Sequence, residues 1–223
     1  MARYFLPRHV HFCGRGDVFV FLDLKRDDYT LINGETAIAL QALLSSGEEK
    51  HDALKELLEE GLLTTDGLAG RTVVATDMDL AVEPLVDADE PVPTSVNFFH
   101  IVHFVTACLT AAVKLRWHHI ERVVASVERR KFHHAHLKRD WNARARELTG
   151  VFQRLRYFFP FDYLCLYDSL AMVEFLARYR IFPTWVFGIR LDPWTAHCWV
   201  QDGRFTFNEG VEEAAGYTPI MAI

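Results

Sequence analysis

Two residues in the last third of the chain, Cys165 and His197, could together form a nucleophilic site. Cys165 lies near the start of a helix predicted over residues 162–180, and His197 lies on the second of two strands that follow it. The positive end of a helix lowers the pKa of a thiol, and a neighbouring imidazole stabilises the thiolate. The backbone N–H of Cys165 could also stabilise an oxyanion. This order of residues predicts a cysteine nucleophile that reacts through an acyl-enzyme.

A third residue should orient the imidazole of His197, and the register of the following hairpin decides which residue does so. The segment AHCWVQDGRFTFNEG is typical of a hairpin that turns at Asp202-Gly203. A two-residue turn there places Asn208 opposite His197, whereas a three-residue loop that adds Arg204 places Glu209 opposite it. Either side chain could hold the Nδ1–H of the ring, and a carboxylate supports an imidazolium more strongly than an amide. The residues alone leave both possibilities open.

The N-terminal part of the chain shows strand periodicity followed by helix periodicity. Three short strands are predicted within residues 9–32, separated by Gly14-Arg15-Gly16 and by Lys25-Arg26-Asp27, which is the pattern of an antiparallel meander. Helices are predicted over residues 35–45 and 50–63, the second closed by its glycine. A small sheet followed by short helices is typical of a winged-helix-like unit.

The stretch AVEPLVDADEPVPTS at residues 81–95 separates this part from the candidate site. It is acidic, and its prolines cannot donate backbone hydrogen bonds, so we expect a linker. Long helical patterns follow it and lead into the helix, strand and hairpin that carry Cys165 and His197. The sequence therefore predicts an α+β protein with two domains, at residues 1–82 and 83–223.

Charge is distributed unevenly, and this excludes one class of function. The net charge is −6, while residues 1–90 hold 8 Lys/Arg against 18 Asp/Glu. DNA phosphates would repel so acidic a domain, so we expect no nucleic-acid partner. Between Lys114 and Arg156 the chain is strongly basic, and a solvated helical face is the simplest interpretation. The basic residues there include Arg129, Arg130, Lys131, Lys138, Arg139, Arg144 and Arg146.

Cysteine and histidine spacing argue against a metal or disulfide framework. The four cysteines form no C-x-x-C pair, and the histidines between His100 and His136 lack a known ligand spacing with an attendant carboxylate. We therefore expect no metal and no cofactor. No run approaches eighteen uninterrupted apolar residues, and the first residues lack signal-peptide features, so a cytoplasmic protein without a membrane span is expected.

Three segments near the C-terminus carry a more specific pattern: CLYDSLAMVEFL, WVFGIRLDPWTAHCWVQDGRFTFNEG and YTPI. Over about the final 60 residues the chain resembles the B proteins of lasso-peptide biosynthesis, which are leader peptidases with a papain- or transglutaminase-like fold. The resemblance implies that Cys165 is the nucleophile and His197 the base. The third member is usually an Asp that follows Asn; here Glu209 holds that position, after Asn208.

The resemblance also implies a function for the first domain. Such B proteins are fused to, or partnered with, a recognition element in which the precursor's leader peptide docks as an added strand beside the third strand and against a helix. The residues so implied are Tyr29, Thr30, Leu31 and Ile32 on the strand edge, and Leu54, Leu57 and Leu58 as an apolar wall.

Beside the Cys165–His197 pattern, the resemblance implies a leader peptidase that binds a ribosomally made precursor and hydrolyses the leader–core bond through a Cys165 acyl-enzyme. The resemblance implies that the freed core amine passes to a separate, asparagine-synthetase-like lasso cyclase, and that the leader's penultimate Thr is read near the site. Acyl transfer of the transglutaminase type would use the same two residues, because only the acceptor differs. A peptide-binding module without catalysis is a third possibility.

Overall fold

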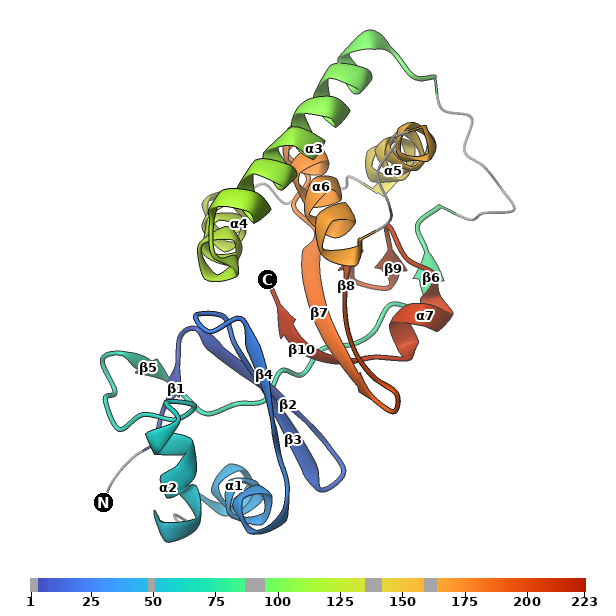
Figure 1. The fold of residues 1–223 in the computed structure, drawn as a ribbon. Coiled ribbons are helices and arrows are strands. Elements are labelled where there is room, and N and C mark those ends of the chain that lie inside the picture. Colours follow the sequence, from blue (N-terminus) through green and yellow to red (C-terminus); the bar gives the residue numbers. More distant parts are fainter. Residues whose placement is uncertain (1–3, 48–50, 87–94, 135–141, 159–163) are drawn as a thin grey trace. The chain divides into compact units, whose positions relative to one another are not determined.

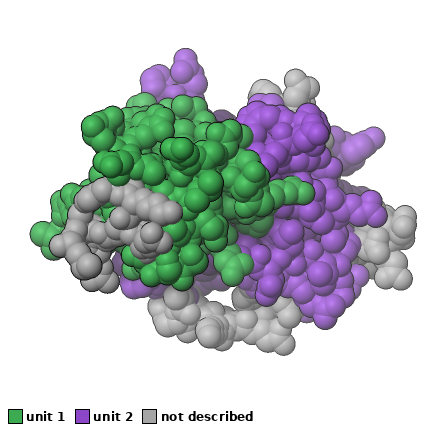
Figure 2. All heavy atoms as spheres, turned by 90° about the horizontal axis from the view of Figure 1, so that it is seen from below, with its two compact units in different colours: residues 1–77, 119–121, 218–221 green, residues 78–118, 122–217, 222–223 purple. Residues whose placement is uncertain are grey.

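The computed structural model describes residues 4–47, 51–86, 95–134, 142–158 and 164–223. The chain forms two compact units (Figure 2). The first comprises residues 1–77, 119–121 and 218–221, and the second comprises residues 78–118, 122–217 and 222–223. The chain passes from the first unit to the second between Asp77 and Met78. The sequence predicted this boundary five residues later, after residue 82.

The first unit contains the antiparallel meander that the sequence predicts, in the order β2-β3-β4 (Figure 1). Phe12 pairs with Phe21 across β2 and β3, and both rings are fully buried beneath the helices. Gly61 has φ +71° and ends the second helix, as expected, because this conformation favours glycine. The elements are β1 (Leu6–Pro7), β2 (Val10–Arg15), β3 (Val18–Asp23), β4 (Asp28–Ile32), α1 (Gly34–Ser46), α2 (His51–Glu59) and β5 (Gly70–Arg71).

The second unit contains a layer of helices and the strands β7, β8, β9 and β6 of a five-stranded sheet whose order is β10-β7-β8-β9-β6 (Figure 1). Within this layer α6 packs against β8 and against α3, so the start of α6 is fixed relative to the sheet. The strands are β6 (Glu83–Pro84), β7 (Thr184–Leu191), β8 (Trp194–Asp202), β9 (Phe205–Thr206) and β10 (Thr218–Ala222). The helices are α3 (Phe98–Trp117), α4 (Ile120–His134), α5 (Asn142–Tyr157), α6 (Cys165–Ala177) and α7 (Val211–Ala215).

Part of the expected linker belongs to the sheet, which corrects the prediction for Glu83 and Pro84. β6 pairs in parallel with β9, and the backbone N–H of Leu85 donates to the carbonyl of Thr206 at 2.7 Å. Pro84 is compatible with this strand because β6 lies at the sheet edge, where a missing N–H is tolerated. Residues 87–94 lie outside the described part of the chain.

The hairpin between β8 and β9 has neither predicted register, because its turn begins at residue 203 and not at residue 202. Gln201 pairs with Thr206 and Asp202 with Phe205, so the turn is Gly203-Arg204. Gly203 has φ +53°, as tight two-residue turns require. The sequence pattern favoured Asp202 as a turn residue, but Asp202 pairs with Phe205 in the ladder between β8 and β9.

Several of the basic residues have structural roles, which corrects the view of a simple solvated face. Glu174 on α6 is buried, with a side chain 3% exposed, and it accepts hydrogen bonds from Lys114 at 2.9 Å and Arg130 at 2.8 Å. Burial would raise the pKa of Glu174, but Arg130 and Lys114 hold it below its ordinary value. Lys131 donates to Thr184 at 2.9 Å. Lys114 and Arg130 therefore join α3 and α4 to α6, and Lys131 joins α4 to β7.

Arg130→Met is expected to destabilise the protein because it leaves the buried Glu174 with one cation. We expect a loss of about 2–3 kcal/mol, below the full value for an unpaired buried charge because Lys114 remains. Arg129→Met, an exposed neighbour on the same helix, is the matched control and should cost little. Urea unfolding followed by tryptophan fluorescence measures the difference, and equal midpoints for the two variants would contradict the structural role of Arg130.

Helix α3 has an apolar exposed side as well as a buried one. Phe104 and Ala107 face the core, while Val105 and Leu109 are exposed on the outer side. Among the residues that the structure describes, α3 is the one helix long and apolar enough to cross a membrane, and 28% of that stretch is buried. Length and composition alone do not distinguish a membrane helix from a core helix of this kind.

Candidate active site

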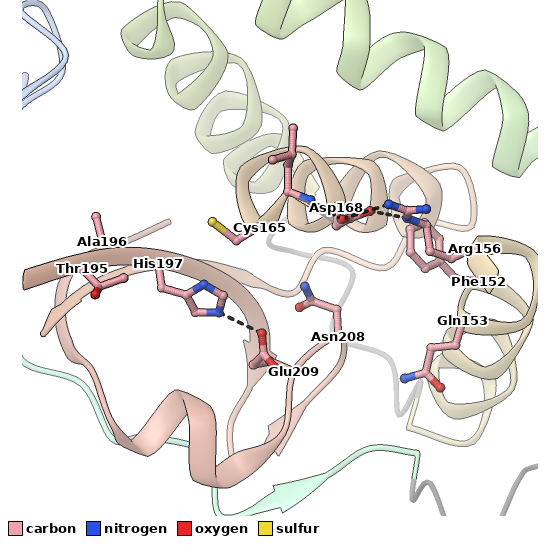
Figure 3. A pocket seen from close by; sticks show the side chains of 11 residues that line it. Phe152, Gln153, Arg156, Cys165, Asp168, Thr195, Ala196, His197, Asn208 and Glu209 are labelled. Carbon is pink, nitrogen blue, oxygen red and sulfur yellow. Dashed lines mark hydrogen bonds and ion pairs between the residues drawn. The ribbon is translucent and has the colours of Figure 1, made fainter. Parts of the chain in front are cut away.

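Cys165 is the first residue of α6, whereas the sequence predicted it near the start of a helix over residues 162–180. The preceding Leu164 provides no side-chain cap, and the first backbone N–H groups of an α-helix have no acceptor within the helix. Asp168 anchors this turn: its carboxylate accepts the N–H of Leu164 at 3.0 Å and pairs with the guanidinium of Arg156. Both charged side chains are buried. This buried ion pair, which lies beside Cys165 along α6, therefore stabilises the turn that carries the thiol (Figure 3).

His197 lies on β8 and reaches Glu209 through its Nε2, which is 2.8 Å from the carboxylate Oε2 (Figure 3). The ring stacks on Trp199 with an interplanar angle of 18° and contacts Tyr217, so its plane is fixed. This geometry corrects the expected contact through Nδ1. Since Glu209 occupies Nε2, Nδ1 is the nitrogen left for the hydrogen bond between the ring and Cys165.

Asn208 makes a different contact from the one with His197 that the two-residue turn would have allowed. Its Oδ1 accepts the backbone N–H of Val200 at 2.7 Å, just beyond the point where the β8–β9 ladder ends. The Asn208 side chain thereby takes the place of a strand partner and turns the chain so that Glu209 reaches His197. Of the two alternatives left open by the sequence, the structure places the carboxylate, and not the amide, on the imidazole.

Comparison with known proteins gives a match over residues 102–222, to the model of the transglutaminase-like superfamily. This range includes Cys165, His197 and Glu209 and covers more than half of the chain. The chain belongs to the transglutaminase-like superfamily. Its members include cysteine proteases and acyl-transfer enzymes, and the site suits either chemistry. No curated protein and no solved structure matches the chain significantly.

The charges of this transglutaminase-like site favour a thiolate–imidazolium pair. Hydrogen bonds from the Cys198 thiol and from His197 outweigh burial and lower the pKa of Cys165 to about 4. Burial by itself would lower the pKa of His197, but hydrogen bonds to Cys165 and Glu209, with their charges, raise it to about 9. Burial opposes ionisation of Glu209, yet its bond to His197 keeps the pKa below its ordinary value. At neutral pH the nucleophile is therefore already ionised.

A pocket of about 520 Å³ opens over the transglutaminase-like triad (Figure 3). The sequence argument missed Asp168 and Arg156, although an Asp in the first turn of a helix is a detectable signal because it complements the helix dipole. Besides the triad, the lining residues are Phe152, Gln153, Arg156, Leu164, Asp168, Thr195, Ala196 and Asn208. In the described part of the chain, no three His, Cys, Asp or Glu residues are arranged to hold a metal ion.

Glu209→Gln tests the charge of the third residue while keeping a hydrogen bond to His197. A charged hydrogen bond exceeds a neutral one by about 1 kcal/mol, so we expect a roughly fivefold lower kcat. Because the carboxylate raises the pKa of His197, the alkaline limb of kcat/KM should move from about 9 to lower pH. The pH profile of kcat/KM measures this shift, and Glu212→Gln, a change at an exposed glutamate, is the control. Unchanged alkaline limbs would contradict an orienting role for Glu209.

The residues expected to bind a leader peptide fall into two groups. Tyr29, Thr30 and Leu31 lie on β4, an edge strand of the three-stranded sheet, and Leu31 is 47% exposed. Ile32, at the end of the same strand, is buried. Leu54 and Leu57 are fully buried in the core of the first unit, because the stripe that suggested a binding wall is the core face of α2. Of the expected wall only Leu58 is partly exposed, so β4 is the accessible part of the candidate surface.

Proposed function

We propose that this protein is a leader peptidase of lasso-peptide biosynthesis that cleaves its precursor through a Cys165 acyl-enzyme. The observation that carries the proposal is the contact of Cys165, at the helix start, with an imidazole held by Glu209. Membership of the transglutaminase-like superfamily and the resemblance of the C-terminal motifs to the lasso B proteins support it. We expect the protein to act in the cytoplasm, without a metal or cofactor.

The chemistry follows from the ionised pair. The Cys165 thiolate attacks the carbonyl carbon of the scissile bond, and the carbonyl oxygen becomes an oxyanion beside the free N–H groups of α6. The imidazolium of His197 then gives its Nδ1 proton to the departing amine, which leaves as the core peptide. Water, deprotonated by His197, attacks the thioester and releases the leader acid and the thiolate. The charge of Glu209 stabilises the imidazolium in the steps in which it is present.

The first unit is proposed to capture the leader along β4. An edge strand offers unpaired backbone groups to an extended peptide, and side chains on the same strand then select the sequence. Binding energy from the leader would position the junction in the pocket over Cys165. The core peptide, with its free amine, would pass to an asparagine-synthetase-like cyclase.

Leu31→Asp is expected to weaken binding of an isolated leader peptide by at least roughly tenfold, because it places a charge in an apolar contact. Leu68→Asp is a matched control, since Leu68 is 93% exposed on the same unit but lies away from β4 in the sequence. Fluorescence anisotropy of a labelled leader measures both. Turnover of a short junction peptide should be the same for both variants, and equal leader affinities would remove β4 from the proposal.

Mass spectrometry of the precursor after incubation tests the function itself. Hydrolysis at one junction gives two peptides whose masses sum to the precursor plus one water. A leader joined instead to an added amine would identify acyl transfer as the reaction. Binding of the leader without any product, in the presence of the cyclase as well, would indicate a peptide-binding module.

A further inference from the structure

A second thiol lies against the proposed nucleophile. Cys198 follows His197 on β8, and because side chains alternate along a strand it points to the opposite face, toward α6. The Cys198 side chain and its backbone N–H both hydrogen-bond the sulfur of Cys165. The thiol of Cys198, in the middle of β8, is therefore a hydrogen-bonding neighbour of Cys165 at the start of α6.

Cys198 is held in place by its surroundings. It is 3% exposed, and its Sγ lies 3.4 Å from the hydroxyl of Ser169, one turn after Cys165. Ser169 donates to the carbonyl of Cys165 at 2.6 Å and accepts from the indole of Trp185 at 2.8 Å. An oxidant from solvent therefore reaches the half-buried Cys165 before it reaches the buried Cys198.

We propose that Cys165 and Cys198 form a reversible disulfide when the protein meets a peroxide, and that this bond protects the nucleophile while it stops turnover. The inference rests on the proposed function only for the effect on turnover, since the bond itself requires no substrate. It assigns to Cys198 the role of a resolving cysteine, which the hydrolytic chemistry does not use.

The chemistry balances in two steps. The Cys165 thiolate attacks a peroxide oxygen, the O–O bond breaks, and protonation of the departing hydroxide gives water and a Cys165 sulfenic acid. The sulfur of Cys198 then attacks the sulfenic sulfur, and its thiol proton leaves with the hydroxyl as a second water. Two thiols are oxidised and one peroxide is reduced. A dithiol such as dithiothreitol reverses the bond and becomes a disulfide itself.

The charges at the site favour this order of events. Burial, followed by the hydrogen bond and charge of Cys165, raises the pKa of Cys198 well above its ordinary value, so Cys198 is not the first thiol to react. Once Cys165 is a neutral sulfenic acid, its negative charge no longer opposes ionisation of Cys198. Burial raises the pKa of the other two cysteines as well, and to about 12 for Cys13. Cys165 is therefore the thiol that peroxide should select.

The test compares wild-type protein, Cys198→Ala and Cys108→Ala, the last being a matched loss of another buried cysteine in the same unit. Each is treated with hydrogen peroxide, blocked with iodoacetamide under denaturing conditions and mapped by mass spectrometry. Wild type and Cys108→Ala should yield a peptide pair linked through Cys165 and Cys198, with alkylation of Cys165 fully restored by dithiothreitol. Cys198→Ala should instead carry two or three added oxygens on Cys165, which dithiothreitol does not remove.

Other outcomes overturn the inference. Oxygen adducts on Cys165 that accumulate equally in wild type and Cys198→Ala would show that Cys198 does not resolve the sulfenic acid. A disulfide to Cys13 or Cys108 would do the same. If the protein cleaves its precursor but forms no Cys165–Cys198 bond after peroxide treatment, this inference alone is wrong. If the protein forms the bond but does not cleave a precursor in its reduced state, the proposed function alone is wrong.

Discussion

Cys165→Ala is expected to lower the rate of precursor cleavage by roughly four to six orders of magnitude, as loss of the nucleophile does in comparable enzymes. The structure gives the reason: the thiolate stands at the start of α6, and its neighbours Cys198 and His197 lower its pKa to about 4. No other described cysteine could replace it, because Cys13, Cys108 and Cys198 are all buried. Single-turnover cleavage, followed by mass spectrometry, measures the loss.

The control for this prediction separates chemistry from folding. Cys108→Ala removes a buried thiol from α3 in the same unit and should retain cleavage close to wild type. Leader binding should be unchanged in both variants, because Cys165 lies in the second unit and the proposed leader surface on β4 lies in the first. Substantial cleavage by Cys165→Ala would contradict the acyl-enzyme and would require another nucleophile.

His197→Ala is expected to have the second largest effect. General acid–base catalysis contributes roughly 10²–10⁴-fold, and that factor should be lost from kcat/KM. The variant should also raise the pKa of Cys165 above about 4, because a hydrogen bond and a positive charge that favour the thiolate disappear. The rate of iodoacetamide alkylation against pH measures this pKa without any peptide substrate.

The direction in which the cleavage rate changes with pH follows from the pKa shifts of Cys165 and His197. In the wild type the thiolate is present above a pKa of about 4 and the imidazolium is present below about 9, so cleavage should be highest between these limits. His118→Ala, an exposed histidine, is the control and should leave the alkylation profile unchanged. An alkylation midpoint that is the same in His197→Ala and the wild type would show that His197 does not stabilise the thiolate.

Much of the local structure could be predicted from residue patterns. The alternation in residues 9–32 predicted the meander, and the apolar spacing after Leu164 predicted a helix that carries Cys165 at its start. Gly61 was expected to close α2 and does so. These features depend on interactions between residues close in the sequence, where periodicity and backbone preference decide the outcome. The type and order of most elements were accessible for this reason.

Contacts between distant segments were not accessible in the same way. The prolines at the start of the expected linker suggested an irregular segment, but β6 pairs with a strand more than a hundred residues later in the chain. The basic segment suggested a solvated surface, because nothing local to Arg130 shows that Glu174 is buried beside it. The stripe of α2 was correctly apolar, yet only packing shows that Leu54 and Leu57 face the core.

By itself the sequence determined which residues can react and in which elements they lie: a cysteine near the start of a helix, a histidine on a strand, and an amide or a carboxylate beyond the next turn. The tertiary structure alone decided how they meet. A shift of the hairpin turn to Gly203-Arg204 changes the register, and the Asn208 contact with Val200 then brings Glu209 to the Nε2 of His197. Register depends on hydrogen bonds between strands, which differ little in energy for neighbouring alignments until the surrounding core selects one.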